Sequence, residues 1–522
     1  MSEFNLLDEP WIPVLDTNGT QRELSLTDVF RQADKIAAIT SELPTLDAAL
    51  LRLLLAIMHA SLARSVQDYA EAIDLWRELW ENGLPAEEIC AYLERWRDRF
   101  WLFDDERPFG QVSFAEPPEN VVFTAKDVSQ LNGSISDGNT PNVFSGRTGS
   151  QRNTLIYAEA ARWLLHLNSF DVAPAGAPPK PPKLLVKGYG LGWLSQIGLL
   201  WLNGENLFQT LMFNFVLKDC SESKPQWEIN DKLTETSIQR VQLIPPDNLA
   251  ELYTIPWRRI KLVKSGNVIN GYELWGGCTI DTQNAFIEPM TMWRGSDNAY
   301  KPILHDAKKQ LWRDFSSLTV NKKQDNAPGI IKWLSEIKYE TEIELPMLKI
   351  RTAAFGYQKN TKVSDCFSDS LSFNSLLLSS LCEAWIPRIT DLLADTEKAV
   401  FAVGVLALDL AEASGDRRDN KGYASKTMEG KRDAAKQEAY FRLDEPFRGW
   451  LSSIDPQNDA IDKKSDEWRR TAHFVLQRLG KEIINQSGTT AFTGYKNKNA
   501  PNAHNKFTYT ISKIFKPEEI EI

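Results

Sequence analysis

The sequence predicts an α+β protein with a large mixed N-terminal domain followed by a C-terminal four-helix bundle. Apolar residues recur at helical spacing in residues 45–100, which indicates amphipathic and buried helices. Residues 205–365 mix short strand-like runs with turn signals and some helix. From about residue 371 the pattern is helical to the end. We therefore place a boundary near residue 370, which gives domains 1–370 and 371–522.

The chain is long and apolar enough for large buried cores, and its net charge is negative. The chain has 522 residues, 42% hydrophobic residues and 25% charged residues, which suits two or three globular domains. Its formal net charge is −10. Proteins that bind nucleic acids on their own are commonly basic, because phosphate contacts supply much of their affinity. The charge argues against an independent DNA-binding protein, but not against a subunit whose partners supply the basic surface.

The N-terminal residues predict a short strand, a turn and a buried helix. Trp11–Val14 reads as the strand, and Thr17–Gly19 carries an Asn-Gly turn signal. Thr45 is placed to cap the helix that follows. The most apolar stretch, Leu46–Leu62, is interrupted by charged or polar residues, and its uncharged core is too short to span a bilayer. We expect a core helix. The interruptions are Asp47, Arg52 and His59.

Two loop-like stretches and one hairpin stand out between residues 128 and 365. Residues 128–153 are rich in Gly, Ser, Thr and Asn, and long loops inside compact domains are often functional. A proline-rich spacer, Ala173–Lys183, leads into the glycine run Lys187–Trp193. These glycines permit either a tight turn or a close approach to another backbone, such as DNA. Tyr339–Asp365 alternates as strands do, with a hairpin tip at Gly356–Thr361.

The C-terminal region predicts four helices of similar length, which is the pattern of a helical bundle. The expected helices cover residues 374–394, 396–414, 431–452 and 465–486.

The sequence carries no recognisable catalytic motif. No nucleophile elbow, phosphate-binding loop, zinc-protease motif or paired-carboxylate motif is present. No two of the five cysteines form a CxxC pair, and the five histidines lack metal-ligand spacing. We expect no cofactor, no metal and no enzymatic activity. With no secretion signal in Met1–Pro13, we expect a cytoplasmic protein.

Four short segments resemble the CasA family, the large subunit of the type I-E CRISPR Cascade complex. Asn5–Val14 (NLLDEPWIPV) resembles the family's N-terminal string. Phe100–Phe103 with Arg107–Gln111 matches its F-x-L-x(4)-H-P-F-x-Q segment, with arginine in place of histidine. Further matches follow in family order at Phe355–Thr361 and Glu438–Arg442.

The resemblance implies a subunit of an RNA-guided surveillance complex. Such a subunit recognises the protospacer-adjacent motif in double-stranded DNA, promotes unwinding and R-loop formation, and helps recruit a helicase–nuclease. Pairing with the CRISPR RNA supplies the longer sequence specificity. The implied partners are target DNA, the CRISPR RNA, other Cascade subunits and the recruited helicase–nuclease, without a membrane.

The resemblance also implies contact residues in three segments. A long loop at about 130–153 contacts the guide RNA or neighbouring subunits. A glycine loop enters the minor groove, and a hairpin tip splits the first base pair as a wedge. The loop contacts are Val143, Phe144 and Ser145; the glycine-loop contacts are Lys187, Gly188, Gly190 and Gly192; the tip contacts are Gln358, Lys359, Asn360, Thr361 and Lys362. Some members of the family carry CxxC-like cysteine pairs, which suggest a zinc site. In the corresponding regions this chain has Leu155–Ala158 and Ser265–Asn267 instead, so we expect no metal.

Two other functions stay open at this point. A metal-dependent nuclease could assemble its ligands from distant positions, and metal-dependent DNA cleavage would identify it. A purely structural adaptor would tolerate substitution of the glycine run and the hairpin tip without loss of motif-dependent DNA binding.

Overall fold

The computed structural model divides into two compact units. The first comprises Met1–Ala307, Lys322–Glu344 and Lys349–Ser370; the second comprises Lys308–Asn321, Leu345–Leu348 and Leu371–Ile522. A single boundary near residue 370 assigns 308–321 and 345–348 to the N-terminal domain, whereas their contacts place them with the C-terminal residues. The division into domains 1–370 and 371–522 stays a prediction. The structure describes residues 3–112, 124–132, 147, 152–170, 191–218, 223–229, 245–275, 280–296, 299–319, 326–341, 343–358, 362–378, 382, 384–418, 422–495 and 498–516.

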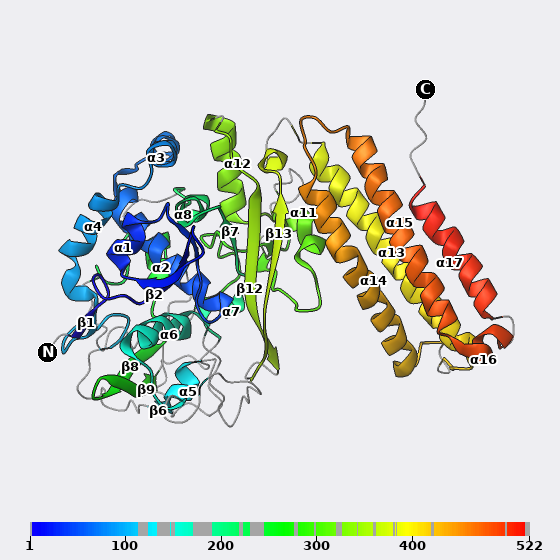
Figure 1. Cartoon of the computed structure of the whole chain (residues 1–522), viewed down its shortest axis with the longest axis horizontal. Helices are drawn as coiled ribbons and strands as arrows, with labels where there is room; N and C mark the ends of the chain where they lie inside the picture. The colour runs from blue at the N-terminus through cyan, green and yellow to red at the C-terminus, as the bar shows by residue number, and fades with distance from the viewer. Residues whose placement is uncertain are drawn as a thin grey trace. The chain divides into compact units, whose positions relative to one another are not determined.

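Mixed helix and sheet are confirmed in the first unit (Figure 1). Near its N-terminus, strand β2 (Ile12–Asp16) pairs antiparallel with both β3 (Gln21–Leu24) and β4 (Ile36–Ile39). The predicted turn between β2 and β3 is present. Gly19 adopts φ +81°, a left-handed conformation that glycine reaches without the steric cost a side chain would impose.

Helix α2 (Pro44–Leu62) forms a buried centre of the first unit, as the sequence predicted. By length and composition alone the segment Pro44–Ser65 could cross a membrane, but 94% of its most apolar window is buried inside the protein. The predicted cap at Thr45 is wrong. The N-cap position is Leu43, and Pro44 opens the helix because a proline in the first turn needs no N–H partner. The Thr45 hydroxyl instead lies 3.0 Å from His166 Nε2.

A three-stranded sheet carries the predicted hairpin. Its order is β13 (Lys362–Phe373), β12 (Leu348–Gln358), β7 (Leu200–Asn203). Neighbouring strands joined by only three residues, 359–361, must run antiparallel, so β12 and β13 form a hairpin. The strands begin later than predicted, because Tyr339 lies in helix α12 (Gly329–Thr341).

The first unit contains further strands and helices. Strands β6 (Thr124–Asp127), β9 and β8 form another three-stranded sheet, and β1 (Glu3–Asn5) pairs with β5 (Trp101–Phe103). The remaining bounds are α1 (Leu26–Arg31), α3 (Tyr69–Asn82), α4 (Ala86–Arg95), α5 (Val128–Leu131), α6 (Tyr157–Phe170), α7 (Trp193–Gln196), α8 (Leu207–Asn214), α10 (Leu249–Thr254), β8 (Arg259–Ser265), β9 (Val268–Trp275), β10 (Trp293–Arg294) and β11 (Lys301–Pro302).

The second unit is helical, as predicted, but its helices differ from the predicted ones. Among the described residues of this unit, the long helix α13 packs chiefly against α14, α15 and α17, and it also contacts α16 (Figure 1). The helices predicted at 374–394 and 396–414 are one continuous helix, and the predicted set missed α17. The bounds are α11 (Phe315–Leu318), α13 (Trp385–Ala413), α14 (Lys426–Ser452), α15 (Ile461–Asn485), α16 (Gly488–Thr493) and α17 (Ala500–Ile514).

Long-range contacts are found both at the predicted break in α13 and in residues 308–321. Thr396, at the predicted break, is buried inside α13, where its hydroxyl donates to the Leu392 carbonyl and accepts from Trp468 Nε1 at 3.0 Å. Trp312 stacks on Phe447 with ring centroids 4.6 Å apart. Its Nε1 donates to Asp444 at 2.7 Å, so residues 308–321 pack with the helices of this unit.

Candidate nucleic-acid interface

The three segments predicted to contact nucleic acid are described mainly at their ends. Gly192 is described in full, whereas Gln358 and Lys362 are placed only as the last residue of β12 and the first of β13. The structure therefore bears on how the segments are held and not on their tips. The predicted contacts outside the described residues are Val143, Phe144, Ser145, Lys187, Gly188, Gly190, Lys359, Asn360 and Thr361.

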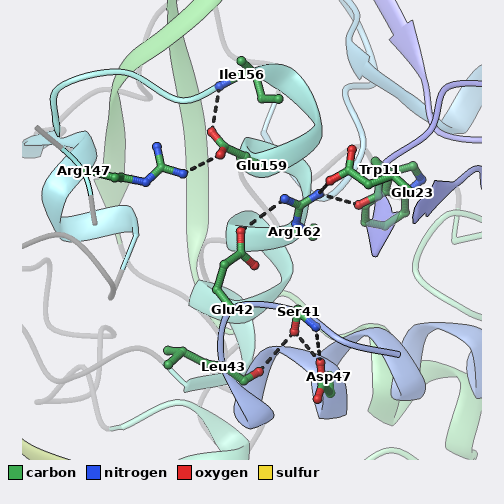
Figure 2. A network of polar contacts seen from close by, with 10 residues as sticks. All are labelled: Trp11, Glu23, Ser41, Glu42, Leu43, Asp47, Arg147, Ile156, Glu159 and Arg162. Carbon is green, nitrogen blue, oxygen red and sulfur yellow. Dashed lines mark hydrogen bonds and ion pairs between the residues drawn. The ribbon is translucent and has the colours of Figure 1, made fainter. Parts of the chain in front are cut away.

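Helix α6 fixes the end of the long loop through an ion pair. The Arg147 guanidinium donates to the Glu159 carboxylate, and the second carboxylate oxygen accepts the Ile156 N–H at 3.1 Å (Figure 2). Glu159 therefore satisfies a backbone donor at the start of α6 and holds the loop residue at the same time. Both charged side chains are about four-fifths shielded from solvent (20% and 18% exposed), so water screens the pair less than it would a surface pair.

Arg162 locks α6 against the N-terminal sheet. This side chain is 5% exposed, and its Nη1 donates to the Trp11 carbonyl and to Glu23, each at 2.7 Å. Its Nη2 donates to Glu42 at 3.2 Å (Figure 2). A buried guanidinium that spans three partners leaves α6 little freedom to rotate, because each donor has a fixed direction.

The other end of α6 holds the glycine run. A Cβ at Gly192 would lie 2.4 Å from the Ser169 carbonyl oxygen and 2.8 Å from the Phe170 amide nitrogen, so only glycine fits. The Ser195 hydroxyl adds a 3.0 Å hydrogen bond to the Phe170 carbonyl. Gly192 is buried, and the backbone that approaches it belongs to the protein's own helix. Gly192 therefore anchors the glycine run on α6, and its predicted DNA contact stays a prediction.

A buried carboxylate fixes the residue after Gly192. Glu288 is 0% exposed; its two oxygens accept from Arg52 Nη1 and Nη2 at 2.9 and 3.0 Å, and Oε2 also accepts from Trp193 Nε1 at 2.6 Å. The Trp193 ring also stacks on Trp257, with centroids 5.6 Å apart and planes 14° from parallel. The glycine run thus ends on a rigid support.

Helix α6 also supports the hairpin. Phe355 of β12 meets the rings of His166 and Phe170 edge-on, at centroid distances of 5.6 and 5.7 Å. Four residues earlier on β12, the Arg351 guanidinium forms an ion pair with the Asp47 carboxylate at the start of α2, with Nη2 3.7 Å from Oδ2. Burial raises the pKa of Asp47, while hydrogen bonds from Ser41 act in the opposite direction (Figure 2). Helix α6 therefore contacts a described residue of each of the three predicted segments.

The sequence model of the CRISPR-associated protein Cse1 family matches residues 5–479. The chain belongs to the Cse1 family.

Related proteins and solved structures agree with this assignment. A CasA/Cse1 protein of Thermus thermophilus is 32% identical over 327 residues, which is 61% of this chain and 60% of that protein. The crystal structure of Thermobifida fusca Cse1 superimposes with a TM-score of 0.83 at 28% identity, over 98% of each chain. A chain of a CRISPR RNA-guided surveillance complex shares the fold, with a TM-score of 0.71 at 16% identity, over 98% of this chain and 100% of that one.

The sequence alone did not reveal the buried charged residues that hold α6 and the glycine run in place. In the sequence Arg52 stands only as an interruption of an apolar helix, and no motif marks Glu288 or Arg162. A signal did exist, since an arginine within a buried helix requires a buried partner. The partner could not be named, because 236 residues separate Arg52 from Glu288. Among the described residues, no group of three His, Cys, Asp or Glu side chains could hold a metal ion.

The buried histidine of α6 predicts acid sensitivity. Burial lowers the pKa of His166 from 6.5 to about 3, so the folded protein keeps it neutral while the unfolded chain takes up a proton below pH 6.5. Stability is then lost as pH falls from 6.5 towards 3, by up to about 1.4 kcal/mol per pH unit for this residue. We expect His166→Gln to reduce the loss of melting temperature between pH 7 and pH 5. An identical loss in the wild type and the variant would contradict this prediction.

Proposed function

We propose that this chain is the large subunit of a type I-E CRISPR RNA-guided surveillance complex. In this role it recognises the protospacer-adjacent motif in double-stranded DNA, promotes unwinding and R-loop formation, and helps recruit the helicase–nuclease. Membership of the Cse1 family and the fold shared with a chain of a CRISPR RNA-guided surveillance complex support the proposal.

The observation that carries the proposal is the shared support of the three segments by α6. Arg147 ties the long loop to the start of this helix, Gly192 lies against its end, and Phe355 of the hairpin packs on its side. Loops with unrelated functions would have no need of one rigid support. A loop on the guide RNA, a glycine loop in the minor groove and a wedge at the first base pair must keep a fixed spacing along one nucleic acid.

In the proposed role the protein binds and does not catalyse. It works in the cytoplasm, reads only a short duplex motif, and leaves sequence recognition to the CRISPR RNA. Its net charge of −10 fits a subunit whose partners supply most of the phosphate contacts. Val143, Phe144 and Ser145 are proposed to meet the guide or a neighbouring subunit, and Lys187, Gly188 and Gly190 to meet the motif.

The test replaces the hairpin tip in the reconstituted complex. A Gly/Ser tip in place of Gln358–Lys362 is expected to weaken binding of a motif-bearing duplex at least about tenfold, the equivalent of about 1.4 kcal/mol. Binding of the matching single-stranded target should stay as in the wild type, because that target needs no strand separation. The control is a Gly/Ser replacement of the exposed turn Thr17–Thr20, another hairpin turn.

Three outcomes separate the alternatives. Unchanged duplex binding by the tip variant would support a purely structural adaptor. Equal loss on duplex and single strand would indicate a damaged complex and contradict a wedge. Cleavage of DNA by the purified chain with Mg²⁺ or Mn²⁺, abolished by one Asp or His substitution, would instead support a nuclease.

A further inference from the structure

The hairpin of β12 and β13 extends beyond the strand that flanks it. In the described part of the chain, β7 pairs with β12 from Lys349 to Thr352, whereas β12 continues to Gln358. At roughly 3.3 Å per residue, residues 353–358 span about 20 Å. A two-stranded ribbon is only marginally stable in water unless other elements pack against it. The direction of this ribbon, and with it the position of the tip, therefore depends on side-chain contacts.

The first of these contacts holds both strands at a similar distance from the tip. Phe355, three residues before the end of β12, meets the rings of His166 and Phe170 of α6 edge-on. Cys366, four residues after the start of β13, interacts through its thiol with the Thr45 hydroxyl of α2. That hydroxyl also lies 3.0 Å from His166 Nε2. Helices α2 and α6 therefore hold the two strands at one level.

The second contact lies four residues nearer the base of the hairpin. The Arg351 guanidinium pairs with Asp47 at 3.7 Å and lies 5.4 Å from the centre of the Trp201 ring of β7. Asp47 is itself held in place, because it accepts the Ser41 N–H at 2.7 Å (Figure 2). The side chains of Arg351 and Asp47 are 26% and 10% exposed, so water screens this pair less than it would a surface pair. Arg351 therefore ties β12 to a fixed point on α2.

We propose that Arg351 is a positioning residue for strand separation, and that its ion pair with Asp47 directs the hairpin tip at the first base pair. The inference rests on the proposed function, in which the tip acts as a wedge. Two contacts about 13 Å apart along a strand fix its direction, whereas a strand held only at Phe355 can pivot about that level. The tip lies beyond this pivot, so the pivoting would displace it. A binding group has to be held to within about 0.5 Å of its working position.

The test measures DNA binding by reconstituted complexes that carry Arg351→Met or Arg351→Lys. We expect Arg351→Met to weaken binding of a motif-bearing duplex about tenfold, and Arg351→Lys, which keeps a positive charge beside Asp47, to weaken it about threefold or less. Both variants should bind as the wild type does when the first base pair beside the motif is replaced by a mismatch in the non-target strand. That target needs no wedge, because its first pair is already open.

Two further variants exclude a general effect of charge on DNA binding. Lys349→Met removes a positive charge from an exposed residue two positions earlier on β12, and it should bind both duplexes as the wild type does. Asp47→Asn should weaken binding of the matched duplex, although it removes a negative charge. The double variant Arg351→Met/Asp47→Asn should lose no more than Arg351→Met alone, because both residues act through one contact.

Replacement of the tip, measured in parallel, separates this inference from the proposed function. If the tip replacement weakens duplex binding and Arg351→Met does not, the positioning role is overturned and the wedge stands. If neither change affects duplex binding, the wedge itself is overturned. An equal loss on the matched and the mismatched duplex, or a loss as large for Arg351→Lys as for Arg351→Met, also overturns the positioning role. Should the Arg351→Met complex not assemble, Asp47→Asn decides by the same comparison of matched and mismatched duplexes.

Discussion

Glu288→Gln is expected to lower the free energy of unfolding of the first unit by about 3 kcal/mol or more. The carboxylate is fully buried and neutralises Arg52, which is 4% exposed. Its removal leaves a buried guanidinium without a counter-charge, and the loss of a charged partner inside a protein is far more costly than its loss at the surface. The measurement is calorimetric melting, in which the transition of the first unit should move down by several degrees.

An exposed ion pair serves as the control, because it tests whether the expected loss of stability depends on the burial of the pair and not on its charge alone. Arg31 and Glu87 also pair at 3.0 Å, but their side chains are 45% and 80% exposed. Glu87→Gln should therefore leave the transition nearly where it is, because water screens both charges. Adding Arg52→Met to Glu288→Gln should restore part of the loss by removing the uncompensated charge. Equal shifts for Glu288→Gln and Glu87→Gln would contradict the assigned role of this pair.

The parts of the fold that sequence predicted are those set by local patterns. The α+β class follows from hydrophobic periodicity, and the turn at Gly19 follows from a residue that tolerates positive φ. The hairpin of β12 and β13 follows from alternation broken by a polar tip. Each of these features depends on residues close together in the chain, so one sequence is enough to read it.

The parts that sequence mispredicted depend on distant partners. The predicted break falls beside Thr396, yet Thr396 lies within α13, where Trp468, 72 residues away, donates to its hydroxyl. Thr45 looks like a cap, but it faces His166, 121 residues away. Polar side chains that can end a helix can also be satisfied across a core, and only the tertiary fold decides between the two.

The candidate site divides in the same way. Its segments were found from composition and from resemblance, whereas their supports were not. Glu159, Arg162 and Glu288 are ordinary charged residues in the sequence, and their importance arises only from burial and from the partners that the fold supplies. Gly192 has the right residue type for close backbone approach, and the backbone of α6 does approach it closely.

Gly192→Ala is expected to disturb both the fold and the proposed DNA contact. The new methyl group would lie 2.4 Å from the Ser169 carbonyl oxygen, a separation that requires the backbone of α6 or of the glycine run to move. In the assembled complex, we expect binding of a motif-bearing duplex to weaken at least about tenfold. A lower melting temperature of the isolated chain should accompany this loss, since overpacking against a rigid backbone is destabilising.

The control for Gly192→Ala is a glycine with open space around it. Gly430 lies on the exposed side of α14, and a Cβ there meets nothing within 4 Å. Gly430→Ala should raise stability by up to about 1 kcal/mol, because alanine favours the helix, and should leave DNA binding unchanged. If Gly192→Ala lowers the melting temperature but spares duplex binding, the glycine run is structural only. If it weakens the duplex and spares the single-stranded target, the position of this run is what strand separation requires.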